Sequence, residues 1–230
     1  MKAKTVKLNL MLSYPVNWTK WQILRDLIQN FYDDAGYKRF GKSFHYCHHE
    51  NSDTNGTLIL SMKSAGFSYE WLVHMGATTK QETKRKFAGF YGEGFKLAAM
   101  CALRDYAWSI NVRSRNWYLS VTTIDTIIDG KTLRQLAYRI EDDIEYSDQT
   151  IITIENFHKE DLPTVETAIQ NFYYPENTLL GELIWHGDCG SIYTRSEIQK
   201  PKDLPVSFDC GGRESYFSLI RHVVRLLLPL

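Results

Sequence analysis

The stretch RKFAGFYGEGFKLAAM, residues 85–100, contains Gly89, Gly92 and Gly94 in a G-x-x-G-x-G spacing. An apolar run that favours a helix follows directly. Glycines this dense let the backbone bend sharply or approach a ligand closely. The start of a helix offers free N–H groups and a positive dipole end, which suit a phosphate. The alternative is a plain tight turn, because these glycines lack the Rossmann βαβ context and no Walker G-K-[ST] follows them within the stretch.

The segment 18–35 has a second polar pattern. Asp26, Asn30 and Asp33 stand at i, i+4 and i+7, so on a helix they share one narrow stripe. Two carboxylates flanking a carboxamide supply oxygen ligands suited to Mg²⁺, and one carboxylate could orient an attacking water. The alternative is the solvated face of an amphipathic helix. The apolar face of that helix would consist of Trp21, Leu24, Leu27, Ile28 and Phe31.

Two other groups contain metal-ligating or nucleophilic side chains. Strand alternation places His45, Cys47 and His49 on one face, but structural zinc takes four ligands and no second cluster is obvious, so ordinary strand residues are favoured. His186 and Cys189 could suggest a Cys–His nucleophile, but the surrounding WHGDCG is typical of a hairpin turn.

Composition places further bounds on function. The chain has 230 residues, 43% hydrophobic, with a formal net charge of zero, so nothing electrostatic favours a nucleic-acid or membrane partner. No signal peptide opens the sequence and no run approaches a membrane span. The four cysteines are scattered, which indicates reduced thiols in a cytoplasmic protein. We expect one domain over 1–205 and a tail of unknown role over 206–230, whose apolar end could contact a protein partner or a second copy.

The order of elements predicts the fold class. Hydrophobic periodicity predicts strands at 4–12, 43–50, 56–64, 107–114, 117–125, 134–142 and 150–156, helices at 18–35, 68–77, from the glycine turn to about 103 and at 161–173, and a hairpin at 183–195. Regular βαβ alternation is missing. This order therefore indicates an α+β fold, a two-layer sandwich of a mixed, mostly antiparallel sheet with helices on one face.

The helix stripe and the glycine turn, in this order, resemble the GHKL ATPase superfamily, which includes gyrase, the 90-kDa heat-shock chaperone, sensor histidine kinases and MutL. RDLIQNFYDDAG looks like the family's N box, usually E-L-x-x-N-x-x-D-A. SAGFSYEWLVHMGATTK looks like the end of the first glycine box and the helix after it. KFAGFYGEGFKLA is similar to the second glycine box. The resemblance covers roughly residues 5–160 and implies the family's ATP-binding fold, with ATP and Mg²⁺ as cofactors.

The resemblance implies roles for individual residues. Asn30 matches the residue that holds Mg²⁺ against the phosphates, Asp33 matches a carboxylate of the adenine-pocket wall, and Asp26 matches the residue that activates water. Residues 77–88 match a lid that closes over the nucleotide. The remaining matches, in the phosphate loop, at the helix start beneath the phosphates and just before the lid, are Gly89, Gly92, Glu93, Gly94, Phe95, Lys96, Thr79 and Lys80.

Three departures from the family pattern bear on activity. Asp26 replaces a glutamate and is one methylene shorter, which predicts slow hydrolysis. Met62 falls where the family has its adenine-reading aspartate, with Ser64 at the first glycine, so the mode of adenine recognition stays open. Asp34 replaces a small alanine. Two hypotheses follow: a slow Mg²⁺-dependent ATPase whose lid closure drives a conformational change, and a nucleotide-binding or interaction module that does not hydrolyse ATP.

Overall fold

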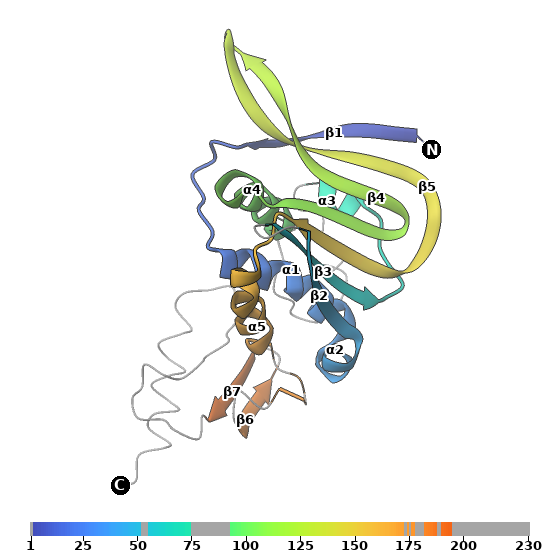
Figure 1. Ribbon diagram of the computed structural model, residues 1–230, viewed down its shortest axis with the longest axis vertical. Coiled ribbons are helices and arrows are strands. Elements are labelled where there is room, and N and C mark those ends of the chain that lie inside the picture. Colours follow the sequence, from blue (N-terminus) through green and yellow to red (C-terminus); the bar gives the residue numbers. More distant parts are fainter. Residues whose placement is uncertain are drawn as a thin grey trace.

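The computed structural model describes residues 2–51, 55–74, 93–172, 174, 176–177, 182–187 and 190–194. Two long strands dominate it, β4 (Ser109–Ile128) and β5 (Lys131–Glu155). They are paired along nearly their whole length and form the spine of a five-stranded sheet (Figure 1).

The other three strands of this sheet are β1 (Lys2–Met11), β2 (Phe44–Glu50) and β3 (Gly56–Lys63). Strand β5 takes two successive partners on the side away from β4. Its first part, Gln135 to Asp142, pairs with β1, and its last part, Gln149 to Glu155, pairs with β3. Strand β2 then pairs with β3. Every pairing among the described strands is antiparallel.

The structure corrects the prediction of four separate strands between 107 and 156, because each consecutive pair is one bent strand. Positive φ angles mark the bends, 50° at Arg115 in β4 and 60° at Asp143 in β5. The register of β4 against β5 shifts on both sides of Arg115. These irregularities lie where β5 changes partner from β1 to β3, and they let one pair of strands serve both parts of the sheet.

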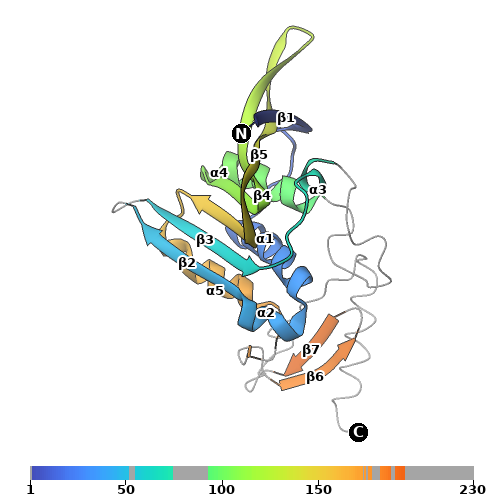
Figure 2. The same cartoon turned by 90° about the vertical axis from the view of Figure 1, so that its right-hand side faces the viewer.

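A two-residue turn joins β4 to β5. Asp129 and Gly130 both have positive φ, 49° and 74°, as a type I′ turn requires. The pairing of β5 with β1 ends at Gln135, which lies opposite Met11 and, on the other side, Ile124. Residues 124–135 therefore project past β1 as a two-stranded extension, called the arm below (Figures 1 and 2).

The α+β prediction is confirmed by the helices that accompany this sheet. They are α1 (Lys20–Ala35), α2 (Tyr37–Ser43), α3 (Glu70–Val73), α4 (Gly94–Tyr106) and α5 (Leu162–Gln170), with a 3₁₀ turn at Lys159–Asp161. Figure 2 shows α1, α2 and α5 on one side of β2 and β3. The sequence did not predict α2.

Local chemistry explains the bounds of α1. Thr19 and Gln22 form a reciprocal capping box at its start, which satisfies backbone N–H groups that the first turn leaves unpaired. Gly36, with a φ of 69°, ends the helix.

The core lies between the helices and the covered face of the sheet. Strand β3 alternates, with Leu58, Leu60 and Met62 buried. Its partners are the apolar face of α1 and the small side chains of α4, among them Ala98 and Ala99, which are fully buried. This packing fixes α1 and α4 against each other and against the sheet.

One arginine fixes the connection between β1 and α1. The guanidinium of Arg104, on α4, donates to the carbonyls of Leu12, Tyr14 and Val16. It also donates to the side-chain oxygen of Asn17 and is paired with the neighbouring Asp105.

The hairpin predicted near residue 188 is confirmed. β6 (Glu182–Gly187) and β7 (Gly190–Thr194) pair as an antiparallel two-stranded sheet. The tail over 206–230 lies outside the described residues, and so does the boundary predicted at 205.

Candidate functional site

The helix stripe and the end of the glycine turn meet in the structure. Gly94 is the first residue of α4, and a Cβ added to it would lie 2.6 Å from Oδ2 and 2.8 Å from Oδ1 of Asp26. The carboxylate of Asp26 therefore rests directly against the first turn of α4. That turn has backbone N–H groups without partners inside the helix and carries the positive end of its dipole. Asp26 and Gly94, from two sequence features far apart in the chain, thus lie in contact.

Asn30 lies one turn further along α1. Its side chain is exposed, and its amide nitrogen donates to the carbonyl of Asp26 at 3.2 Å. That bond uses the nitrogen, whereas the amide oxygen is the atom that a metal ion takes. Asp33, on the next turn, is half-buried, as is Asp26. Two of the three stripe residues are thus half-buried, and Asn30 between them is exposed.

Phe95 and Lys96 point into the protein. Phe95 is buried, and its ring lies edge-on to Tyr138 with centroids 6.1 Å apart. Lys96 is only 1% exposed, and its ammonium donates to the carbonyl of His74 at 2.9 Å. Burial lowers the pKa of Lys96, and Glu93 opposes that shift in part. These two side chains pack α4 against the rest of the protein, whereas Glu93, at the helix start, is exposed.

Four of the residues matched to the cofactor site, Thr79, Lys80, Gly89 and Gly92, lie outside the described residues. The lid expected at 77–88 does so too. The structure therefore describes two parts of the candidate site: the polar stripe of α1 and the start of α4.

A cluster of hydroxyl groups that the sequence did not reveal lies at the end of β3. The hydroxyl of Thr150 is 2.9 Å from that of Ser64 and 3.0 Å from that of Ser114. Ser64 also accepts from the backbone N–H of Gly66, whose φ is 69°. Ser114 is fully buried and Thr150 nearly so.

Asp34 connects this cluster to α1. Burial raises the pKa of Asp34, and the guanidinium of Arg39 and the hydroxyl of Ser64 each oppose the shift. The alternation of β3, which buries Leu58, Leu60 and Met62, continues to Ser64 just past its end, and this was the signal available in the sequence. The structure places Met62 itself in the apolar core, 3% exposed, and directly opposite Thr150 of the hydroxyl cluster in the register of β3 and β5.

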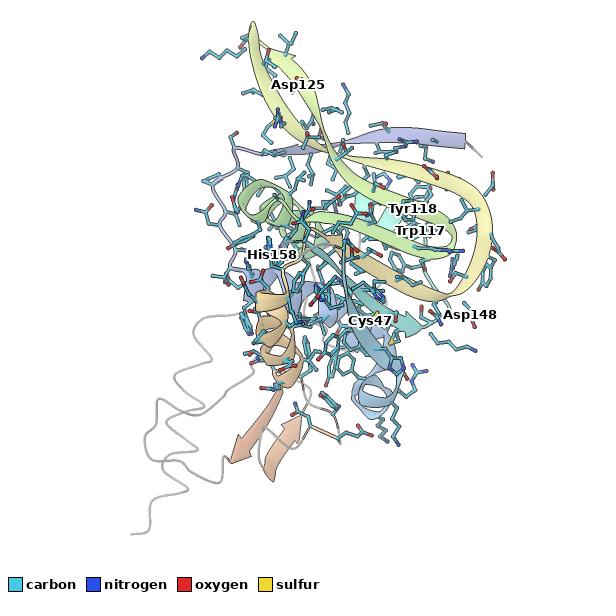
Figure 3. The ribbon with its side chains drawn as sticks, in the orientation of Figure 1. Cys47, Trp117, Tyr118, Asp125, Asp148 and His158 are labelled. Atoms are coloured by element: carbon cyan, nitrogen blue, oxygen red, sulfur yellow. The ribbon has the colours of Figure 1, made fainter. Side chains whose placement is uncertain are left out.

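The predicted histidine and cysteine group lies on β2, on which Cys47 is labelled in Figure 3. The sulfur of Cys47 is 3.6 Å from Nε2 of His49. Within the described part of the chain, no group of three or more metal-ligating side chains is present.

The chain was compared with known proteins. No protein-family model matches it, and no curated protein matches it at a significant level. Among the described residues, no helix is both long and apolar enough to span a membrane.

The polar stripe of α1 beside the start of α4 has the chemistry to bind a phosphate together with a cation. A helix N-terminus accepts anionic groups, and a carboxylate beside it needs a cation to share the site with a phosphate. Mg²⁺ suits that need, because it takes one or two protein oxygens and keeps several waters. The amide oxygen of Asn30 is an oxygen donor of this kind, so a magnesium-bound phosphate group is chemically compatible with the residues present.

Proposed function

We propose that this protein is a Mg²⁺-dependent ATP-binding module of the GHKL type that hydrolyses ATP slowly, with closure of the lid driving a conformational change. The observation that carries the proposal is the contact between Asp26 and Gly94, which unites the two motifs of the resemblance. The α+β architecture, with α1 and α4 packed side by side over an antiparallel sheet, is consistent with it.

In this proposal the protein binds the triphosphate at the start of α4 and the metal ion through Asn30. Mg²⁺ held by Asn30 would neutralise charge on the phosphates. The carboxylate of Asp26 accepts a proton from the water that attacks the γ-phosphorus, as the bond to the leaving oxygen of ADP breaks. Because Asp26 is shorter than glutamate, its carboxylate holds that water less well, and turnover is slow.

The hydroxyl cluster is a candidate contact for the adenine or guanine base of the nucleotide. Ser64, just past the end of β3, and Thr150, on β5, lie within hydrogen-bond distance, and the rise that burial causes in the pKa of Asp34, near the end of α1, is opposed by the hydroxyl of Ser64. Hydroxyl groups can donate or accept, so they can contact either adenine or guanine, directly or through water. We therefore expect weak discrimination between ATP and GTP.

The alternative is a module of the same fold that binds nucleotide or a protein partner without hydrolysis. It is favoured by the shortened Asp26 and by the inward direction of Lys96, whose ammonium is bonded to a backbone carbonyl. A cytoplasmic location is part of both proposals, because the two described cysteines, Cys47 and Cys101, are free thiols.

Thermal unfolding with and without nucleotide tests binding. A ligand at a hundred times its Kd stabilises the folded state by about 2.7 kcal/mol, which for this chain length raises Tm by roughly 5–10 °C. Mg·ATP should produce such a shift, and Mg·GTP a similar one. Asn30→Ala should abolish the magnesium-dependent part, whereas Asn9→Ala, a matched change on β1, should not. An unchanged Mg·ATP shift in Asn30→Ala would refute the metal role.

Phosphate release then separates the two functions. Asp26→Glu should raise steady-state hydrolysis with little effect on nucleotide affinity, and Asp26→Asn should remove hydrolysis while binding persists. If Asp26→Asn hydrolyses ATP as fast as the parent, Asp26 is not the base. If the parent binds Mg·ATP without any turnover, the non-hydrolysing module is the correct function.

A further inference from the structure

The tip of the arm exposes two adjacent isoleucines. Ile127 is 74% exposed, more than any other large hydrophobic side chain in the described chain, and its neighbour Ile128 is 45% exposed. Successive residues of a strand lie on opposite faces, so these two isoleucines expose apolar surface on both faces of the arm at its tip.

Strand β4, which leads to this tip, has an unpaired edge. It pairs with β5 and with no other described strand. Ile128 and Lys131 flank the two-residue turn, so their backbone groups face each other. Alternation along the strand then directs the N–H and C=O groups of Val121, Thr123, Asp125 and Ile127 away from β5. No backbone hydrogen bond among the described residues uses these outward groups.

The features that normally protect an edge strand are scarce here. The segment LSVTTIDTII, residues 119–128, contains no proline, glycine or lysine. Its single charge is Asp125, and Nε of Arg134, across the arm, lies 4.0 Å from its carboxylate. Figure 3 shows Asp125 on the arm, well away from the helices. Since the formal net charge of the chain is zero, two copies have no overall repulsion to overcome.

We propose that the outer edge of β4 pairs antiparallel with the same edge of a second copy of this chain, so that the two arms form a continuous sheet about a two-fold axis. This inference is independent of nucleotide binding. In a symmetric pairing the same residue of both copies lies at the axis, and the sequence favours Ile124 for that place.

The charges and side chains select this register. With Ile124 at the axis, Val121 lies opposite Ile127 of the second copy, and Asp125 lies opposite Thr123, whose hydroxyl can donate to it. A register centred on Asp125 would place two carboxylates face to face. A register centred on Thr123 would place Asp125 opposite Val121, which offers no hydrogen bond.

Sedimentation of the full chain over a concentration series tests the association. The parent should show a monomer–dimer equilibrium. Thr123→Pro removes an outward N–H and leaves the pairing with β5 intact, so it should raise the dissociation constant about tenfold or more. The matched control Thr123→Val keeps the N–H group and should dimerise like the parent. A parent that is monomeric at every concentration, or a proline variant that dimerises like the valine variant, would overturn the proposal.

Cysteine pairing tests the register. In a background with Cys47, Cys189 and Cys210 changed to serine, Ile124→Cys should form a disulfide-linked dimer on mild oxidation, because it would face its own copy across a non-hydrogen-bonded pair. Thr126→Cys would lie several residues from its copy and should not cross-link. Equal cross-linking of both variants would reject the register, and cross-linking of neither would reject the pairing.

Discussion

Gly94 illustrates how a single hydrogen atom can keep a functional group in place. Any side chain at this position would put its Cβ within 2.6 Å of the carboxylate of Asp26. That carboxylate is the end of a short side chain that can move, so a larger residue should displace Asp26 and leave the fold intact.

The change Gly94→Ala should therefore lower the affinity for Mg·ATP by about tenfold, equivalent to roughly 1.4 kcal/mol, with little change in Tm. Calorimetric titration measures the affinity. In an Asp26→Ala background the same change at Gly94 should have no further effect, because the carboxylate it displaces is absent. Equal losses in both backgrounds would show that Gly94 acts without Asp26.

Lys96 should make the stability of the folded protein rise as the pH rises from neutral. Burial lowers the pKa of its ammonium in the folded state below the ordinary value of 10.5. Between the folded and unfolded pKa values, the unfolded chain binds more protons, so stability rises with pH through that window. At neutral pH the charged, buried ammonium opposes folding, and this opposition fades as the pH approaches about 10.

Comparison with Lys96→Met isolates this contribution, because methionine fills a similar volume without a charge. Denaturant unfolding should show the parent gaining stability relative to Lys96→Met as pH rises from neutral to about 10. The other titrating groups are the same in both proteins and cancel in the difference. A constant or falling difference across that range would contradict the lowered pKa.

At the scale of elements, the bend in β5 has a defined backbone cause. Asp143 has a φ of 60° and an exposed side chain. The backbone conformation, and not side-chain contacts, therefore decides which residues position 143 tolerates. This left-handed region costs a residue with a Cβ roughly 1 kcal/mol, and more if it is β-branched.

Asp143→Val should thus destabilise the protein by about 1–2 kcal/mol, and Asp143→Gly should be close to neutral. Chemical denaturation gives both values. Asp148→Val, at another exposed aspartate of β5 without a positive φ, is the control and should change stability by less than about 1 kcal/mol. Equal losses of stability at both positions would show that the left-handed backbone at Asp143 is not the cause.

Several elements were predictable because their signals are local. The Asp-Gly turn after β4 requires two positive φ angles that these residues readily adopt, and Gly36 ends α1 for the same reason. The continuity of β5 was not predictable, because a bend at Asp143 looks in the sequence like a break between two strands. Helix α2 was missed because YKRFGKS is too short for periodicity to appear and contains Gly41.

For the candidate site, the sequence predicted that α1 and α4 would each contribute residues, and the site itself stays a prediction. The spacing of Asp26, Asn30 and Gly94 identified residues from α1 and α4, and the structure brings Asp26 and Gly94 into contact. The inward direction of Lys96 depends on where the end of α3 lies, which no local pattern encodes. The hydroxyl cluster depends on the register between β3 and β5, in which Met62 lies opposite Thr150. Long-range register is set by the whole sheet.

At the scale of the whole molecule, β5 belongs to both parts of the sheet. Leu8 on β1 and Leu58 on β3 lie at opposite ends of its pairing, and both belong to one hydrophobic core. A shared strand and a shared core predict that the two parts unfold together.

Leu8→Ala and Leu58→Ala should each lower a single melting transition by roughly 5–15 °C, since such changes cost about 2–5 kcal/mol in a core. Differential scanning calorimetry is the measurement, with agreement between the calorimetric and van't Hoff enthalpies as the criterion. Tyr146→Ala, at an exposed position on β5, is the control and should leave Tm nearly unchanged. Two resolved transitions, only one of which moves, would show that the parts are separate units.

The guanidinium of Arg104 has a consequence for how this sequence can change over evolutionary time. It binds carbonyl groups of the backbone, which every residue possesses, so Leu12, Tyr14 and Val16 can be replaced without loss of those bonds. Arg104 has no such freedom, because lysine lacks the planar fork that reaches several acceptors at once. Natural variants of this protein should therefore vary in the segment between β1 and α1 while arginine at 104 stays invariant.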